Sequence, residues 1–226
     1  MEFDTFTTRE KNIMSKPKVD FSIYLLTDEN CLQGRNLLDC VAEALESGVT
    51  LVQYRAKNKE SNLLYREAYA LKKLCDGYNK LLIINDRLDI AMAVKAAGVH
   101  LGQNDLSCSV AREILGNDYI IGVSAHNIKE ALQAEQDGAD YLGCGAVFYT
   151  NSKSDVKKIG LNKLCEIHNA VSIPVVGIGG INVTNYGQVL KTGANGAAMI
   201  SGILAASDIK AEVRKLIKIK ESIVQI

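Results

Sequence analysis

The sequence contains no tryptophan, only two prolines and no pair of cysteines spaced as C-x-x-C. Its six cysteines are scattered along the chain, and the polar first twenty residues lack the apolar segment of a secretory signal. These absences argue against a disulfide framework, so we expect reduced, mostly buried thiols in a cytoplasmic protein. No stretch approaches the ~20 consecutive apolar residues that a membrane-spanning helix requires.

Neither sign of charge is in excess, because Lys+Arg and Asp+Glu both number 26. This balance gives no electrostatic reason to expect nucleic acid or an anionic membrane as a partner. We therefore expect small-molecule ligands, and any anion among them must be bound by a local cluster of cations. The sequence leaves open whether the chain forms a homo-oligomer.

The chain is long enough for one large domain or two small ones, since it has 226 residues, of which 47% are hydrophobic and 23% charged. Its two prolines, Pro17 and Pro174, mark no proline-rich linker between domains. We predict one domain over residues 21–226, preceded by a flexible N-terminal tail over residues 1–20.

Short apolar runs alternate with amphipathic stretches along the whole domain. There are eight runs, namely 21–28, 49–56, 81–86, 98–103, 119–125, 140–147, 173–180 and 196–202. The stretches between them have helical spacing, as in 36–48, 62–78 and 127–138, and several end in glycine. Eight strand–helix units of this kind predict a (β/α)8 TIM barrel. The alternative, an open doubly wound sheet, is disfavoured because no G-x-G-x-x-G follows the first strand.

Polar residues follow the predicted strands one after another, at the end where barrel enzymes carry their active sites. The groups are Gln53, Arg55 and Lys57; Asn85, Asp86 and Arg87; His100, Gln103 and Asp105; Ser124 and His126; Thr150, Ser152 and Lys153; and Ser201 beside the glycines of "GIGGI" and "MISGI". Taken singly, Asp86, Asp105 or Ser107 could simply cap the next helix. The repetition at one end of the barrel favours a site.

These residue types are suited to anions. Arg55, Lys57 and Lys153 are cations that could converge on phosphate. Asp86 and Asp105 are oxygen ligands suited to Mg²⁺, and the glycines of the last two strands would let a second phosphate approach backbone N–H groups. The pattern indicates two phosphate subsites, filled either by a diphosphate and a monophosphate or by one extended ligand.

With these residues assembled, the chain strongly resembles the thiamine phosphate synthase (thiamine-phosphate pyrophosphorylase) family from about Tyr24 to about Ser207. The resemblance lies in "VQYRAK", "IINDR", "GVHLGQND", "GVSAHN", "GADYLGCGAVFYTNSK", "PVVGIGGI" and "AAMISGI", in this order. It implies a transferase that joins 4-amino-5-hydroxymethyl-2-methylpyrimidine diphosphate to 4-methyl-5-(2-phosphoethyl)thiazole and releases pyrophosphate. Expulsion of pyrophosphate would come first, which requires neutralised leaving-group charge and two aligned rings more than a strong base.

The resemblance also implies a role for individual residues. The pyrimidine diphosphate would contact Gln53, Tyr54, Arg55, Ala56, Lys57, Asn85, Ser124 and Lys153, of which Arg55, Lys57, Ser124 and Lys153 would be catalytic. The thiazole phosphate would contact Thr150, Asn151, Ser152, Gly180, Ile200 and Ser201. The cofactor would be Mg²⁺ on Asp86 and Asp105.

Two other functions fit part of this pattern. A thiazole tautomerase of the same barrel family would isomerise the thiazole phosphate, with His126 as the candidate acid–base residue, but would need no diphosphate–Mg²⁺ site. A non-catalytic sensor of phosphorylated ligands would be expected to lose the metal carboxylates first. The presence of both Asp86 and Asp105 therefore favours the synthase.

Overall fold

Eight parallel strands close into a barrel in the computed structural model, which describes residues 16–149 and 158–224. The strands are β1 (Ile23–Leu26), β2 (Leu51–Tyr54), β3 (Leu81–Asn85), β4 (Gly98–Leu101), β5 (Ile120–Ala125), β6 (Tyr141–Gly145), β7 (Val175–Ile178) and β8 (Gly196–Met199). They pair in chain order, and β8 pairs with β1 through Ala198 and Tyr24 to complete the ring. The predicted TIM barrel is confirmed.

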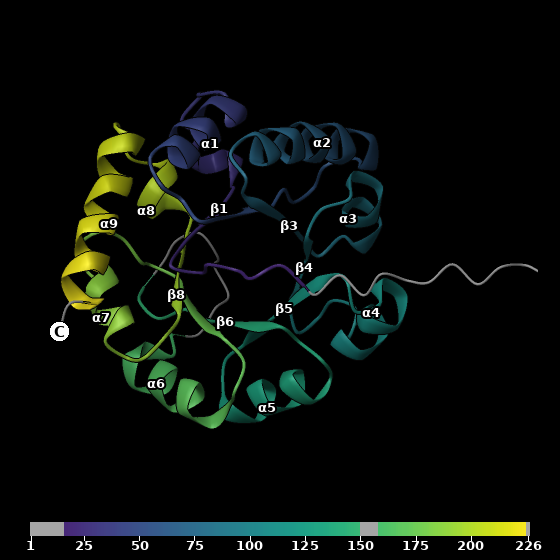
Figure 1. The fold of residues 1–226 in the computed structure, drawn as a ribbon, viewed down its shortest axis with the longest axis vertical. Helices are drawn as coiled ribbons and strands as arrows, with labels where there is room; N and C mark the ends of the chain where they lie inside the picture. The colour runs from purple at the N-terminus through teal and green to yellow at the C-terminus, as the bar shows by residue number, and fades with distance from the viewer. Residues whose placement is uncertain (1–15, 150–157, 225–226) are drawn as a thin grey trace, which may run out of the picture.

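Helices surround the barrel, as Figure 1 shows. They are η1 (Glu29–Cys31), α1 (Leu37–Glu46), α2 (Ser61–Gly77), α3 (Leu88–Val94), α4 (Cys108–Leu115), α5 (Ile128–Gln136), α6 (Gly160–Ala170), α7 (Tyr186–Leu190), α8 (Ser201–Leu204) and α9 (Ile209–Val224). The last helix, α9, packs against α1 and α7 and so covers the junction where the barrel closes.

The strands are apolar on both faces because each face has its own core. In β1, Ile23 and Leu25 belong to the large core between barrel and helices, whereas Tyr24 and Leu26 belong to the smaller core inside the barrel. This alternation follows from the two-residue period of a strand. The helices supply matching apolar stripes, such as Val41 in α1.

The segment before β1 contacts the barrel where it is described. Lys16 forms an ion pair with Asp140, which also accepts a hydrogen bond from Arg112. Residues 1–15, most of the predicted tail, lie outside the described residues. Within the described part of the chain, no helix is long and apolar enough to cross a membrane.

All six cysteines are free thiols in this fold. Cys40, Cys75, Cys108 and Cys144 are buried, and the other two are half-buried. The expectation that most of the cysteines are buried is confirmed.

Candidate active site

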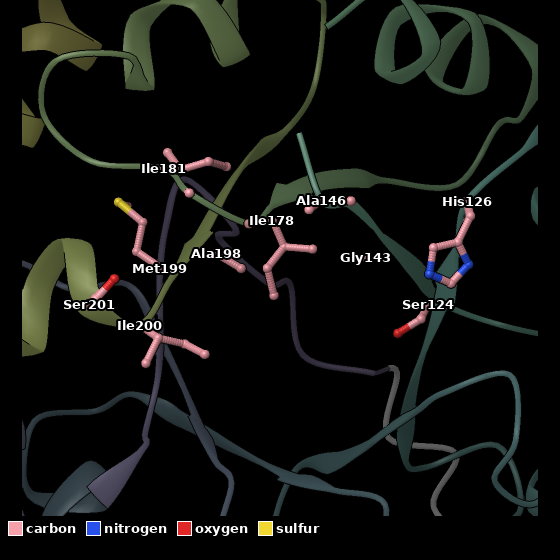
Figure 2. Close-up of a pocket in the computed structure, with 13 residues that line it drawn as sticks. Ser124, His126, Gly143, Ala146, Ile178, Ile181, Ala198, Met199, Ile200 and Ser201 are labelled. Carbon is pink, nitrogen blue, oxygen red and sulfur yellow. The ribbon is translucent and has the colours of Figure 1, made fainter. Parts of the chain in front are cut away.

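A cavity opens at the C-terminal end of the barrel. Its walls come from β5 to β8 and the segments that follow them: Ser124, His126, Gly143, Gly145, Ala146, Ile178, Gly179, Gly180, Ile181, Ala198, Met199, Ile200 and Ser201. In Figure 2, Ser124 and His126 lie on one side of the cavity, and Met199, Ile200 and Ser201 lie on the other. Apolar residues and glycines lie between Ser124 and His126 on one side and Ser201 on the other. Such a lining is suited to a flat organic ring.

The glycine corner of the cavity is formed largely by main chain. Gly180 has a φ of +66°, and a Cβ at this position would lie 2.3 Å from the carbonyl oxygen of Tyr149. Only glycine fits this backbone without strain. Gly180, Ile200 and Ser201, which the sequence assigned to one phosphate subsite, do line the same cavity.

A second hollow continues outward from this corner. It shares Gly180, Ile181 and Ser201 with the first cavity and extends to Asp28 and Asn30 after β1. The C-terminal end of the barrel therefore presents one continuous depression from β5 round to the loop after β1.

Strand β2 directs its predicted site residues in two directions. Gln53 points into the barrel, where its side-chain nitrogen donates to the Tyr24 hydroxyl at 2.6 Å. Its Oε1 is buried and has no hydrogen-bond partner among the described residues. Tyr54 points outward and donates to Glu67 of α2 at 2.5 Å, and Ala56 packs against the same outer core. The structure thus does not bring the Tyr54 side chain to the cavity.

Arg55 is held by residues that follow β1. Its guanidinium donates to Asp28 at 2.6 Å, and its backbone N–H donates to the Thr27 hydroxyl at 2.8 Å. The Arg55 Nε is buried and unpartnered among the described residues. Lys57 lies two residues on and is exposed to solvent. Asp28 was not singled out in the sequence, because its pairing with Arg55 joins two segments 27 residues apart.

The polar end of β3 makes a tight turn. Asp86 has a φ of +60°, its N–H donates to the carbonyl oxygen of His100, and the Arg87 N–H donates back to Asn85 at 2.7 Å. The N-cap position of helix α3 is occupied by Arg87, not by Asp86. Arg87 itself turns away and donates to Asp89 and to Ser61 at the start of α2.

The loop after β4 carries the second predicted carboxylate. Asp105 Oδ2 accepts the Gly102 N–H at 2.7 Å, and the side chain is exposed. Ser107, not Asp105, is the N-cap of α4. Of the three residues for which capping was the alternative, only Ser107 occupies an N-cap position.

Asp86 and Asp105 follow the neighbouring strands β3 and β4 at the same end of the barrel. No cluster of three or more His, Cys, Asp or Glu side chains suited to a metal occurs in residues 16–149 and 158–224. Two carboxylates nevertheless fit Mg²⁺, which commonly takes one or two of them and completes its shell with water and substrate phosphate.

His126 extends from the end of β5 toward the cavity and is held by the next helix. Its Nδ1 lies 2.9 Å from Glu130 Oε2, which also accepts the His126 N–H. Burial alone would raise the pKa of Glu130, but the hydrogen bonds from His126 outweigh it and lower the pKa. Glu130 therefore stays a carboxylate and fixes the orientation of the imidazole.

The sequence did not predict a set of side chains inside the barrel that ends at the cavity. Tyr24 and Tyr141 share a hydrogen bond of 2.9 Å between their hydroxyls, and Tyr141 also contacts His100 Nδ1 at 2.9 Å. His100 Nε2 in turn lies 3.0 Å from Ser124 Oγ. His100 was noticed only as a polar strand-end residue, and nothing in the local sequence marked either tyrosine.

Four of the predicted site residues cannot be placed. Thr150, Asn151, Ser152 and Lys153 lie outside the described residues. The remaining predicted side chains at this end of the barrel come from β2, β3, β4, β5, β7 and β8 and their following segments.

Comparison with known proteins gives consistent results. A sequence model of the family described as thiamine monophosphate synthase matches residues 23–203. The thiamine-phosphate synthase of Clostridium acetobutylicum is 50% identical over 201 residues, which is 89% of this chain and 95% of that protein. The thiamine-phosphate synthase of Ruminiclostridium cellulolyticum is 47% identical over 204 residues, or 90% of this chain and 97% of that protein.

Solved structures agree with these relatives. Thiamine phosphate pyrophosphorylase from Pyrococcus furiosus superposes with a TM-score of 0.84 at 42% identity, covering 91% of this chain and 98% of that one. A thiamine phosphate pyrophosphorylase from Bacteroides thetaiotaomicron has a TM-score of 0.66 at 16% identity, over 89% of this chain and 98% of that one, which is a likeness of fold alone.

Proposed function

The chain belongs to the thiamine monophosphate synthase family, and we propose that it condenses 4-amino-5-hydroxymethyl-2-methylpyrimidine diphosphate with 4-methyl-5-(2-phosphoethyl)thiazole. The products are thiamine phosphate and pyrophosphate. The observation that carries the proposal is the cavity at the C-terminal end of the barrel. It joins a hydrogen-bonding edge at Ser124 to a glycine corner at Gly180 and Ser201, with apolar walls between them.

The pyrimidine diphosphate is proposed to bind toward β2, β3 and β5. Gln53 offers a buried amide oxygen with no partner among the described residues, which an amino group on the ligand could pair with. Arg55 is preorganised by Asp28, because a paired and hydrogen-bonded guanidinium has little freedom to lose when it binds phosphate. Lys57, Asn85 and the undescribed Lys153 complete this subsite in the proposal.

The thiazole phosphate is proposed to bind at the glycine corner. Gly180, Ile200 and Ser201 line it, and the main chain that forms much of this corner offers N–H groups suited to an anion. Thr150, Asn151 and Ser152 are assigned to this subsite by the family resemblance alone.

Mg²⁺ is the proposed cofactor. Asp86 and Asp105 would hold it, and the bound ion would neutralise charge on the diphosphate leaving group. The chain's own cations, Arg55 and Lys57 together with Lys153, would bind the same diphosphate and stabilise it as it departs. The two rings would be kept in line by the apolar walls, so that the thiazole nitrogen meets the exocyclic carbon of the pyrimidine once pyrophosphate has left.

The alternatives are not supported by the comparisons. The relatives that cover nearly the whole chain at about half identity are named as synthases, not as tautomerases or ligand sensors. His126 does line the cavity, but its hydrogen bond with Glu130 accounts for its orientation without a catalytic role.

The test is direct synthesis. Purified protein incubated with both substrates and Mg²⁺ should form thiamine phosphate and pyrophosphate in equal amounts, measured by chromatography and by a coupled pyrophosphate assay. Omitting either substrate should abolish both products, and a chelator should stop the reaction until Mg²⁺ is restored. Pyrophosphate no higher than in the absence of enzyme would overturn the proposed function.

A further inference from the structure

Five side chains from five strands form a continuous series of hydrogen bonds across the interior of the barrel. Gln53 Nε2 contacts the Tyr24 hydroxyl at 2.6 Å, and the Tyr24 and Tyr141 hydroxyls are 2.9 Å apart. Tyr141 reaches His100 Nδ1 at 2.9 Å, and His100 Nε2 reaches Ser124 Oγ at 3.0 Å. The series begins in the buried core and ends at the wall of the cavity, where Ser124 is labelled in Figure 2.

Two glycines make space for this series. A Cβ at Gly122 would lie 2.1 Å from Tyr141 Cζ, and a Cβ at Gly143 would lie 2.8 Å from His100 Cε1. These glycines stand inside β5 and β6, where a side chain would normally stabilise the strand. The Tyr141 and His100 rings therefore occupy space that is free because Gly122 and Gly143 have no side chains.

The direction of the hydrogen bonds follows from counting hydrogens. The Gln53 amide nitrogen can only donate, so the Tyr24 oxygen accepts. If Tyr24 gives its single hydrogen to Tyr141, then Tyr141 gives its own to His100 Nδ1, and both hydroxyl hydrogens have an acceptor. With Gln53 Nε2, and not Oε1, against Tyr24, the reverse direction would leave the Tyr24 hydrogen in the core without an acceptor. Burial raises the pKa of both tyrosines, so both hydroxyls keep their hydrogens at neutral pH.

This direction of the hydrogen bonds determines which ring nitrogen of His100 carries the hydrogen. When Nδ1 accepts a hydrogen bond, the neutral imidazole carries its hydrogen on Nε2. His100 Nε2 then donates to Ser124 Oγ, and the hydrogen of the Ser124 hydroxyl is directed away from His100. The backbone of Ser124 is held independently, since its carbonyl oxygen accepts a hydrogen bond from Gln103 at 2.6 Å.

We infer that Tyr141 and His100 are positioning residues that make the Ser124 hydroxyl a hydrogen-bond donor toward the cavity. A ligand that places an acceptor there, such as a ring nitrogen, is favoured over one that places a donor. The consequence for turnover rests on the proposed function, in which Ser124 contacts the pyrimidine. The hydrogen arrangement itself rests on the geometry alone.

Nitrogen-15 NMR of histidine-labelled protein tests the arrangement without any substrate. The chain has three histidines, and His100→Gln identifies the signals of His100. We expect a neutral His100 with its hydrogen on Nε2 and a hydrogen-bonded Nδ1. In Tyr141→Phe the Nδ1 acceptor loses its donor, so the two ring-nitrogen shifts should move toward each other as the tautomers mix.

Steady-state kinetics tests the consequence. Tyr141→Phe should lower kcat/KM for the pyrimidine diphosphate about tenfold, the size of one hydrogen bond. The KM for the thiazole phosphate should not change, because its proposed contacts at Gly180 and Ser201 lie elsewhere. Tyr186→Phe is the matched control: Tyr186 is fully buried and donates one hydrogen bond, to the carbonyl oxygen of Ser22, outside the series. It should leave both kinetic parameters unchanged.

The NMR experiment and the kinetic experiment can each overturn the inference. A His100 that is cationic or carries its hydrogen on Nδ1 in the wild type would overturn it, and so would ring-nitrogen shifts unaffected by Tyr141→Phe. Equal kinetic effects of Tyr141→Phe and Tyr186→Phe would show that Tyr141 acts only on stability, which also overturns it. A wild type that makes no thiamine phosphate would refute the proposed function instead, while the NMR result would still stand.

Discussion

Among single residues, Asp86 offers the sharpest test of the proposed Mg²⁺ site. Its φ of +60° is left-handed, a conformation that asparagine tolerates, so Asp86→Asn changes charge without disturbing the turn. We expect the Mg²⁺ concentration for half-maximal activity to rise about tenfold, which corresponds to about 1.4 kcal/mol of binding free energy. Any change in the free energy of unfolding, measured in urea, should be smaller than this loss of Mg²⁺-binding free energy.

Asp89→Asn is the control for that substitution. Asp89 is also a carboxylate of this region, but it pairs with Arg87 at the start of α3 and faces solvent. Its replacement should leave the Mg²⁺ dependence unchanged. If Asp86→Asn instead unfolded the protein while its Mg²⁺ dependence stayed normal, a structural role for Asp86 would replace the proposed metal role.

The sequence predicted which residues end each strand, but not which side chains meet. Asp86 could be placed at the polar rim because it follows a buried apolar run. The bond between Tyr24 and Tyr141 joins residues 117 apart, and the bond between Arg55 and Asp28 joins the segments that follow two different strands. Such contacts depend on how strands are arranged around the barrel, which no local pattern encodes.

At the scale of elements, local sequence patterns were sufficient to locate the strands. The runs predicted as strands all contain the observed strands, because β1 to β8 are short apolar segments with a core on either side. The predicted helix over 36–48 corresponds to α1 (Leu37–Glu46), which ends before Gly48 with a φ of +111°. Glycine is favoured just beyond a helix because it adopts positive φ without strain. Helix starts were harder to predict, since capping by Asp86 and by Ser107 looked alike in sequence.

The capping of α1 leads to a prediction about its stability. Asn36 is the N-cap, and its side chain accepts hydrogen bonds from the N–H groups of Leu38 and Asp39. Asn36→Ala removes that acceptor and should lower the free energy of unfolding by about 1 kcal/mol. Urea denaturation followed by circular dichroism measures the change.

Helix α2 supplies the control for α1. Its N-cap is Glu60, which makes no side-chain capping bond. Glu60→Ala should therefore change the free energy of unfolding by less than about 0.5 kcal/mol. Equal losses from Asn36→Ala and Glu60→Ala would contradict a capping role for the Asn36 side chain.

At the scale of the whole molecule, the buried cysteine thiols and tyrosine hydroxyls predict a loss of stability in alkaline solution. Burial raises the pKa of Cys75 and Cys144 to about 12 and that of Cys108 to about 11, from an ordinary value of 9.0. Above pH 9 the unfolded chain loses these thiol protons while the folded protein keeps them. The folded state then binds more protons, so the free energy of unfolding must fall as pH rises. Below pH 9 both states are protonated and this dependence vanishes.

The size of the effect follows from the same linkage. Each thiol contributes a slope of up to about 1.4 kcal/mol per pH unit between pH 9 and its raised pKa. The buried hydroxyls of Tyr24 and Tyr141, whose pKa values burial also raises, steepen the slope above pH 10. Urea titrations at pH 8, 9, 10 and 10.5 measure it. Cys144→Ala should flatten the curve above pH 9. A free energy of unfolding that stays constant from pH 8 to 10.5 would mean that these thiols are solvated in the folded protein.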